Sequence, residues 1–428
     1  MNQFDVIVVG AGTSGMMAAI AAAKADSRTL LIEKNKRVGK KLLLTGGGRC
    51  NVTNNRPADE IIAHIPGNGK FLYSAFSQFT NYDIMEFFES NGVHLKEEDH
   101  GRMFPVTDRS KTIVDALKQQ LEQLQVTFFT EAKVEKLLHK EQQIIGVALA
   151  DQKVYAPCVI LTTGGRTYPS TGSTGDGYRL AKRLGHSITP LYATESPIIS
   201  NDSFILNKTL QGLSLQDVSL AVLNAKGREI VSHQMDLLFT HFGLSGPAAL
   251  RCSSFVNQEL TKHDQQPVTL SLDIFPEKTE GQLKQELLSR ISAQPEKSAK
   301  NAFKNIVPER LLDYLIDELQ WNQLSAKQLT EKQLEQFISC VKAFKITAAK
   351  TLPIEKSFVT GGGISLKEVQ PKTMESKLVQ GLFFAGELLD INGYTGGYNV
   401  TAAFVTGHVA GTHAAEVASY TYFPPQEN

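Results

Sequence analysis

The sequence has few cysteines, and their spacing argues against cooperative thiol chemistry. Four cysteines occur in the 428 residues, and no two of them form a Cys-x-x-Cys pair. A disulfide framework and a dithiol redox centre are therefore both unexpected, and the composition fits a reducing cytoplasm. The histidines show no metal-ligand spacing either, so the sequence predicts no metal site. The cysteines are Cys50, Cys158, Cys252 and Cys340.

The chain also lacks net charge and long apolar runs. Lys and Arg total 44, Asp and Glu total 44, and the formal net charge is zero. A neutral chain has no general attraction to nucleic acid or to an anionic membrane, so neither is expected as a partner. No apolar stretch approaches the ~20 residues of a membrane-spanning helix, and no secretory leader is visible. We expect a cytoplasmic protein with a small-molecule substrate; the oligomeric state stays open.

What is present begins with a glycine-rich turn after an apolar strand. Residues 4–9 are almost entirely apolar, which is typical of a buried parallel strand. Gly10 permits a tight turn, Gly12 lets a pyrophosphate approach the backbone, and Gly15 lets the next helix pack closely. That helix is expected over residues 14–25, and its N-terminus offers N–H groups and a positive dipole end to phosphates.

An acidic residue completes the dinucleotide pattern. A second apolar strand over residues 29–33 ends in Glu33, about 20 residues after the glycine turn. Its carboxylate can accept hydrogen bonds from ribose hydroxyls and would repel a 2′-phosphate. The order strand, glycine turn, helix and acid predicts dinucleotide binding. The alternative is a structural glycine turn with a Glu33 that is only buried or solvated.

A second glycine segment follows at residues 45–51. Its three successive glycines do not suit the interior of a helix or strand, but they suit a backbone that lies against a planar or anionic ligand. Arg49 can pair with a phosphate or a substrate carboxylate. Cys50 has no partner cysteine, so packing near a ring is favoured over a redox role. The alternative for the whole segment is a structural turn.

Two later segments have the same character. A buried strand over residues 158–161 runs into Thr163, Gly164 and Gly165, and Asp176 follows, where it can cap a helix or bind a cofactor. Near the C-terminus another buried strand ends at Gly386 and Glu387, where an amide and a carboxylate can hold ribityl hydroxyls. A helix then starts after Gly397 and is expected to run to about Val409; its N-terminus would stabilise an anionic reduced flavin.

The chain organisation predicts an α/β protein with an insert. Residues 1–190 together with 346–428 are expected to form a Rossmann FAD-binding domain, because both ends of the chain carry apolar strands and glycine loops. Short β runs predict an inserted β domain over residues 191–276. Residues 277–345 have strong helical periodicity and no catalytic constellation, and they predict a helical insert that packs as a lid or wall.

Together these motifs resemble a known family of bacterial flavoproteins. The segments that carry the resemblance include KKLLLTGGGRCNVTN, GRMFPVTDRS, YPSTGSTGDGY, LLFTHFGLSGPAAL and GELLDINGYTGGYN. They are similar to the NAD(P)/FAD-dependent oxidoreductases of the BaiN/RdsA type, also described as aminoacetone-oxidase-like, and the similarity covers the whole chain. The resemblance implies a glutathione-reductase-like Rossmann FAD domain, a β-barrel-like insert and a small helical subdomain. It also implies non-covalent FAD and a place for the adenine near Val134.

Motifs and resemblance together give the expected cofactor-binding residues. They are Gly10, Gly12, Ser14, Gly15, Glu33, Lys34, Lys40, Thr45, Gly46, Arg49, Cys50, Asn51, Val134, Thr163, Gly164, Gly165, Asp176, Gly386, Glu387, Gly397, Tyr398, Asn399 and Val400.

Hydride transfer needs little more than one proton donor or acceptor beside the substrate. His241, in a glycine-containing loop of the insert, and Tyr394, just before the flavin-facing glycines, are the candidate catalytic residues. For both, a structural hydrogen bond is the alternative role.

The expected function is FAD-dependent oxidoreduction, in which NADH or NADPH drives reduction of an activated C=C bond, as in an enone, in a small or medium apolar metabolite. No second Gly-x-Gly-x-x-Gly unit is present, so the nicotinamide would bind only transiently. One alternative is an FAD-dependent oxidase of a small amine or ketone. Another is a flavin redox sensor without metabolic turnover.

Overall fold

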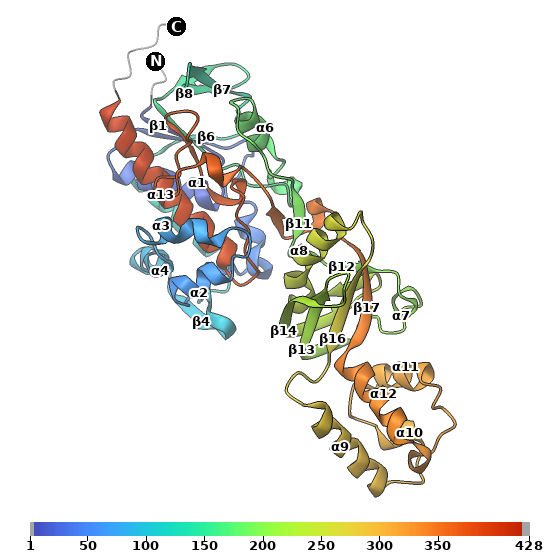
Figure 1. Ribbon diagram of the computed structural model, residues 1–428. Helices are drawn as coiled ribbons and strands as arrows, with labels where there is room; N and C mark the ends of the chain where they lie inside the picture. The colour runs from blue at the N-terminus through green and yellow to red at the C-terminus, as the bar shows by residue number, and fades with distance from the viewer. Residues whose placement is uncertain (1–3, 422–428) are drawn as a thin grey trace. The chain divides into compact units, whose positions relative to one another are not determined.

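The computed structural model describes residues 4–421. Residues 1–3 and 422–428, at the two ends of the predicted FAD-binding domain, lie outside the described part. The chain divides into two compact units: Met1–Tyr192 with Ile354–Asn428 is the first, and Ala193–Pro353 is the second (Figure 1).

The first unit is built on a five-stranded parallel sheet with the strand order β19-β10-β1-β2-β6. Four of its five strands are buried along their whole length and almost entirely apolar, because helices or other chain segments cover both faces of a parallel sheet. All strands run the same way, so the loops that follow them meet at one edge. The strands are β1 Val6–Val9, β2 Thr29–Ile32, β6 Thr127–Phe129, β10 Cys158–Leu161 and β19 Leu382–Phe384.

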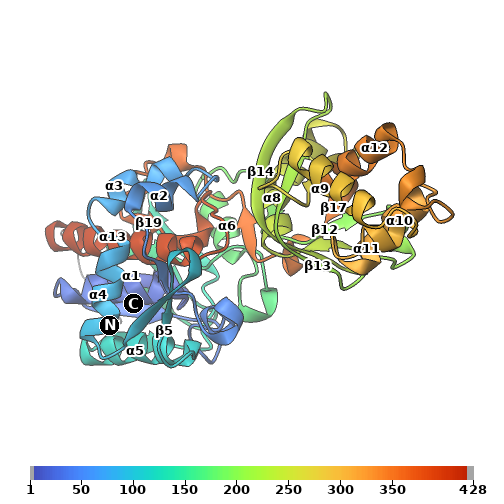
Figure 2. The same ribbon diagram turned by 90° about the horizontal axis from the view of Figure 1, so that it is seen from below.

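Two helices rich in small residues pack closely together in this unit (Figures 1 and 2). They are α1 (Thr13–Lys24) and α13 (Tyr398–Tyr420). A Cβ on Gly407 would lie 2.3 Å from the Ser14 carbonyl oxygen, so only glycine permits this approach. α13 extends well past the end expected near Val409. The glycines that weakened its helical pattern are the residues that face α1.

Shorter elements complete the first unit. The helices are α2 Ala58–Ala63, α3 Tyr73–Phe76, α4 Asn81–Ser90, α5 Ser110–Gln123 and α6 Asp176–Lys182. One antiparallel sheet has the order β3-β5-β4, from Thr53–Asn54, Arg102–Pro105 and Leu95–Glu98. Another is the meander β7 Lys136–Lys140, β8 Gln143–Ala148 and β9 Lys153–Tyr155. β18 Val359–Gly361 pairs with β11 Tyr192–Thr194, which begins at the last residue of the first unit before the boundary.

The second unit contains a closed barrel with the strand order β12-β15-β14-β13-β16-β17. Long strands with alternating buried and exposed positions supply its wall, because every second side chain points inward. Helix α8 (Pro247–Lys262) packs against β13 and β14. The strands are β12 Ile198–Ser200, β13 Ser214–Leu223, β14 Glu229–Phe239, β15 Gly243–Ser245, β16 Val268–Asp273 and β17 Phe344–Thr351, and a short helix α7 spans Ser203–Leu206.

The helices of residues 277–345 share one hydrophobic core with the barrel. Phe204, Tyr314 and Phe344, from α7, a helix and a barrel strand, have ring centroids 5.4–6.0 Å apart. The helical pattern formed as expected, with a capping box between Thr330 and Gln333 at the start of α12. The helices are α9 Glu280–Ala293, α10 Ala299–Ala302, α11 Glu309–Glu318 and α12 Glu331–Lys342.

The unit boundary near the C-terminal side falls later than the sequence suggested. The expectation placed the return to the first domain at residue 346, whereas the second unit extends to Pro353. The reason is that β17 pairs with both β12 and β16 and thereby closes the barrel. Its alternating pattern alone could not show which sheet it joins.

Within residues 4–421, no helix has both the length and the apolar character needed to cross a bilayer. The same residues contain no cluster of three or more His, Cys, Asp or Glu side chains suited to a metal ion.

We predict that Phe337→Ala lowers the free energy of unfolding by about 3–5 kcal/mol, because the fully buried ring packs between Phe303 and Trp321 and its loss leaves a cavity. Chemical denaturation measures this change. The matched control is Leu288→Ala on α9, where the side chain is 45% exposed, and its cost should stay within about 0.5–1 kcal/mol. Equal costs for the two variants would contradict a core shared by helices and barrel.

Candidate functional site

The loop after β1 has the geometry of a pyrophosphate-binding turn. A Cβ on Gly15 would lie 1.8 Å from the Gly10 carbonyl oxygen, so glycine is required where α1 meets the turn. A Cβ on Gly12, the residue that precedes α1, would meet no atom within 4 Å. The N-terminus of α1 therefore faces open space at Gly12, as a phosphate group requires.

Glu33 follows β2, and its carboxylate faces the same turn. Oε2 accepts a hydrogen bond from the Ala11 N–H at 2.9 Å, and Oε1 accepts two from Asn35, at 2.8 and 2.7 Å. An ionised carboxylate has about four acceptor positions, so capacity for a ribose hydroxyl remains. Val134 lies two residues after Ala132, whose N–H donates a hydrogen bond to the Glu33 carbonyl oxygen at 3.0 Å.

Residues 170–176 form a strap that is tied to the segment after Glu33. Lys34 Nζ lies 2.6 Å from both Asp176 Oδ2 and Thr174 Oγ1. Asn35 Nδ2 donates to the Thr171 carbonyl oxygen at 3.1 Å, and Lys40 Nζ donates to that of Ser170 at 3.0 Å. Three side chains that follow the expected ribose-binding acid thus hold one loop.

The charges in this strap favour a stable ion pair. Burial by itself would raise the pKa of Asp176, yet hydrogen bonds from Lys34 and Thr174 bring the pKa below its ordinary value. The sequence predicts that Lys34, Lys40 and Asp176 contact the cofactor. In the structure Lys34 binds Asp176, and Lys40 binds the Ser170 carbonyl oxygen in the same strap.

The three glycines in the segment at residues 45–51 form an exposed turn with unusual backbone angles. Gly46, Gly47 and Gly48 have φ of 56°, 67° and 87°, and three successive left-handed residues are readily formed only by glycine. A Cβ on Gly47 or Gly48 would meet no atom within 4 Å. The backbone at these two residues is therefore open to a ligand.

Arg49 is held by protein groups at the end of this turn. Its guanidinium lies 2.8 Å from Glu98 Oε1 and 3.4 Å from Asp108 Oδ1, and it stacks over the Phe104 ring at 4.2 Å. Hydrogen bonding to Glu98 raises the pKa of Arg49 above its ordinary value. These contacts hold the C-terminal end of the glycine turn against the protein.

Cys50 is fully buried, and burial raises the pKa of its thiol to about 12. The thiol is therefore protonated at neutral pH and is a poor nucleophile. This agrees with the interpretation that Cys50 packs in the site and does not act as a redox group.

Asn51 provides the clearest indication of a missing binding partner. The side chain is 8% exposed, and its Oδ1 atom has no hydrogen-bond partner among the described residues. The Thr163 hydroxyl, in the loop after β10, is also buried and has no hydrogen-bond partner among the described residues. A buried polar atom without a partner costs about 1–3 kcal/mol, so both atoms indicate a ligand.

Glu387, after β19, joins four segments of the chain. Its carboxylate accepts hydrogen bonds from Lys41 Nζ at 2.6 Å, from the Thr360 N–H at 2.9 Å and from the Thr167 hydroxyl at 3.2 Å. The Gly165 N–H lies 3.4 Å away. Burial would raise the pKa of Glu387, but the Lys41 charge and these hydrogen bonds lower it overall. Glu387 is therefore an ionised group that positions the loops.

The start of α13 lies beside the Asn51 amide. Gly397 precedes the helix with φ of 95°, and a Cβ there would lie 3.0 Å from Asn51 Oδ1. The Asn399 side chain bonds back to the loop before the helix, through the Gly393 N–H and the Gly393 and Tyr394 carbonyl oxygens. Tyr398 and Val400 belong to the first turn of α13.

The remaining expected residues fall as follows. Ser14 contacts Gly386, where a Cβ would lie 2.4 Å from the Ser14 hydroxyl oxygen. Gly164 and Gly165 lie against Ser173, Thr360 and Glu387. The two catalytic candidates lie in different units: Tyr394 is buried in the first, and His241 is an exposed residue in the turn between β14 and β15 of the second.

Sequence reasoning missed several residues that build the site. Lys41, Thr167 and Thr360 complete the Glu387 network, and the Thr53 and Thr401 hydroxyls bond to each other at 2.8 Å beneath Gly397. Lys41 lies in a visible basic run, but nothing there separates it from Lys40. The threonines carry no sequence signal, because their partners are far away along the chain.

A family model described as the HI0933-like protein Rossmann domain matches residues 4–413. The chain belongs to this HI0933-like family. The resemblance expected from the motifs is thereby confirmed, as is the α/β Rossmann-type FAD-binding fold with a barrel.

Curated relatives match the HI0933-like chain over nearly all of its length. A ribosomal RNA dihydrouridine synthase of Escherichia coli is 32% identical over 93% of this chain and 95% of its own. A 3-dehydro-bile acid delta(4,6)-reductase of Clostridium scindens is 30% identical over 97% of this chain and 100% of its own. Among solved structures, the 3-ketosteroid delta1-dehydrogenase of Sterolibacterium denitrificans has a TM-score of 0.53 at 14% identity, covering 97% of this chain and 100% of its own, and it shows the fold alone.

The residues present fit FAD, the cofactor of this flavoenzyme fold. The N-terminus of α1 at Gly12 would receive the pyrophosphate, and Glu33 the adenosine ribose. The open backbone at Gly47 and the unpartnered atoms of Asn51 and Thr163 would receive the remainder of the dinucleotide.

We predict that Lys41→Met destabilises the protein by about 1–3 kcal/mol, because it leaves the Glu387 carboxylate, whose side chain is only 20% exposed, without its cation. The depressed pKa of Glu387 means that its contribution to stability is present above the ordinary carboxyl pKa and is lost as pH falls through the folded value. Lys41→Met should therefore reduce the gain in stability between acidic and neutral pH. Urea unfolding at several pH values measures this, with the exposed neighbour Lys36→Met as the unaffected control.

A second prediction concerns the strap. Lys34→Met removes both hydrogen bonds to Asp176 and Thr174, and FAD should dissociate about tenfold faster, a change worth ~1.4 kcal/mol. Recovery of free-flavin fluorescence after dilution measures the rate. Lys182→Met, at an exposed position of α6, is the control. If the two variants release FAD at the wild-type rate, the strap does not retain the cofactor.

Proposed function

We propose that this protein is an FAD-dependent reductase that saturates a C=C bond conjugated to a carbonyl group, with NADH or NADPH as electron donor. The observation that supports this most is what the full-length relatives share. A 3-keto steroid with Δ4 and Δ6 bonds and a uracil ring both contain a C=C bond in conjugation with a carbonyl. In both molecules the same reaction reduces this bond: a hydride adds to the carbon of the C=C bond that lies farther from the carbonyl group.

The residues of the chain have binding and orienting roles in this proposal. The α1 N-terminus and Glu33 fix the adenosine half of FAD, and residues 45–51 place their open backbone beside the flavin half. When bound, FAD supplies hydride chemistry. The α13 N-terminus, which Gly397 precedes, would stabilise negative charge on a reduced flavin and so raise its reduction potential.

For the substrate, a small or medium apolar enone is the first candidate, and uridine in ribosomal RNA is the second. The second is favoured by the RNA-modifying relative, which matches at 32% identity over 93% of the chain. The formal net charge of zero gives no general attraction to RNA, so recognition would depend on local contacts. Tyr394 is proposed to contact the substrate, His241 is proposed as a second candidate catalytic residue, and the first unit is proposed as the FAD-binding domain.

The decisive experiment is an anaerobic titration of the holoprotein with NADH and then NADPH, followed by addition of an acceptor. We expect NADH or NADPH to bleach the oxidised-flavin band at about 450 nm. The band should return when cyclohex-2-enone, a 3-keto-Δ4 steroid or ribosomal RNA that lacks dihydrouridine is added.

Each result has a clear meaning. Recovery with the enones alone supports the small-molecule substrate, and recovery with RNA alone supports the second candidate. A flavin that neither nucleotide reduces contradicts the proposed donor. A reduced flavin that only oxygen reoxidises contradicts the reductase and favours an oxidase.

A further inference from the structure

Three segments of the first unit meet beside Glu33. Lys34 follows Glu33 directly, and its Nζ lies 2.6 Å from Asp176 Oδ2 in the strap. The next residue, Asn35, has a carbonyl oxygen that accepts a hydrogen bond from the Glu131 N–H at 3.2 Å. These contacts make the three segments neighbours. We call their exposed side the basic surface, and it consists of residues 34–40, 131–136 and 170–183.

The basic surface has an excess of positive charge in a chain that is neutral overall. Its three segments contain nine Lys or Arg residues and three Asp or Glu residues, whereas the whole chain has 44 of each kind. Residues 34–40 alone contain four Lys or Arg and no acidic residue. The chain is therefore neutral only as a sum, and an anion near this surface meets a positive field.

Three cations of the basic surface share one carboxylate. Lys34 Nζ, Arg179 Nη2 and Lys133 Nζ lie 2.6, 3.2 and 3.8 Å from the oxygens of Asp176. One carboxylate balances one positive charge, so the cluster keeps an excess of two.

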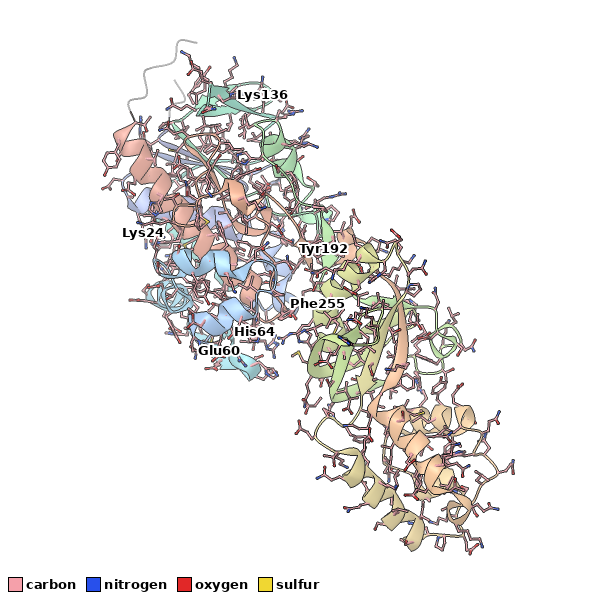
Figure 3. All side chains as sticks on the ribbon, in the orientation of Figure 1. Lys24, Glu60, His64, Lys136, Tyr192 and Phe255 are labelled. Atoms are coloured by element: carbon pink, nitrogen blue, oxygen red, sulfur yellow. The ribbon has the colours of Figure 1, made fainter. Side chains whose placement is uncertain are left out.

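Other cations of the surface have uncharged partners or face solvent. Lys40 Nζ donates to the Ser170 carbonyl oxygen at 3.0 Å, and Arg183 Nη1 donates to that of Glu135 at 3.2 Å. A carbonyl oxygen accepts a hydrogen bond but carries no net charge, so the positive charge remains. The exposed side chains of Lys36 and Arg37 add to it, as does that of Lys136 at the start of β7 (Figure 3).

Cations elsewhere in the same unit are balanced one by one. Near β4 and β5, Arg49 Nη1 lies 2.8 Å from Glu98 Oε1, and Lys96 Nζ lies 2.6 Å from Asp108 Oδ2. Each of these two cations has a carboxylate of its own. The excess of positive charge is therefore specific to the basic surface.

The composition of the basic surface fits the phosphate groups of RNA. Exposed Lys and Arg side chains bind phosphate oxygens by charge-assisted hydrogen bonds, and the exposed Ser170 hydroxyl is a further donor. The three segments, all within the described residues, contain no exposed large apolar side chain. The surface therefore lacks both the apolar centre of a protein interface and a side chain that could insert into a bilayer.

We propose that the basic surface binds the phosphate backbone of RNA, an inference that rests on the second substrate candidate of the proposed function. Phosphate contacts position an RNA without reading its sequence. The basic surface thus supplies the local contacts that a chain without net charge needs, and it leaves the choice of the uridine to the flavin site.

The test measures binding of the oxidised holoprotein to a Cy5-labelled RNA hairpin with a uridine-rich loop, by fluorescence anisotropy at several salt concentrations. Wild-type protein should bind, and the logarithm of its affinity should fall linearly with the logarithm of the salt concentration, because bound phosphates release counterions. The double variant Lys36→Gln/Lys133→Gln removes two exposed cations, and Asp176 keeps Lys34 and Arg179. It should bind about tenfold more weakly and with a salt slope smaller by about 2.

The matched control is the double variant Lys70→Gln/Lys372→Gln. It makes the same change in net charge at two exposed lysines of the first unit that lie outside the basic surface. Its affinity for the hairpin and its salt slope should equal those of wild type. Both double variants should keep the wild-type flavin spectrum and unfolding midpoint, which shows that fold and cofactor are intact. Phosphatidylserine vesicles take the place of the hairpin in a parallel sedimentation experiment.

Several results overturn the proposal. They are a wild-type protein that does not bind the hairpin, equal weakening in the two double variants, and a salt slope that Lys36→Gln/Lys133→Gln leaves unchanged. Binding to the vesicles without binding to the hairpin assigns the surface to a membrane instead.

Binding is measured without an electron donor, so the surface and the proposed function can fail separately. An RNA that binds the basic surface but does not reoxidise the reduced flavin supports the surface and excludes uridine as the substrate. Ribosomal RNA that reoxidises the flavin of wild type and of Lys36→Gln/Lys133→Gln at the same RNA concentrations supports the reductase and excludes the surface.

Discussion

The arrangement of the site depends on the hydrogen bonds that the half-buried Glu387 carboxylate accepts. It accepts hydrogen bonds from Lys41, Thr167 and Thr360, which belong to segments separated by more than a hundred residues along the chain. The side chain is only 20% exposed, so these segments lose hydrogen bonds worth about 1–3 kcal/mol if they move apart. The glycine turn at residues 45–51 begins only a few residues after Lys41, so Lys41 holds it at one end and Arg49 at the other.

The parallel sheet explains why such distant segments can meet. Strands β10, β1 and β2 are neighbours and β19 lies next to β10, so the loops after all four strands emerge at one edge. The chain leaves this unit to form the barrel and helices and then returns with β19 and α13. The close contact of α13 with α1, through Gly407 and Ser14, attaches the C-terminal segment to the N-terminal glycine turn.

The dinucleotide turn and its acid could be predicted because they are local. Gly10, Gly12, Gly15 and Glu33 are close in sequence, and each has a role set by steric room or charge. The hydrogen-bonded networks could not be predicted in the same way. Lys34 and Asp176 were both expected at the cofactor, and the folded chain adds an ion pair between them that their positions in the sequence do not indicate. The extent of α13 was underestimated because its glycines serve a contact with α1.

By itself the sequence determined the fold class, the dinucleotide turn, the family and the amphipathic helices of the insert, because all of these are recorded in spacing along the chain. The tertiary structure decided which strand closes the barrel, which cation neutralises Glu387 and which cations from distant segments share Asp176. These are contacts between residues far apart in sequence. Such contacts are selected by packing and by the need to satisfy buried polar groups, and neither leaves a periodic mark in the sequence.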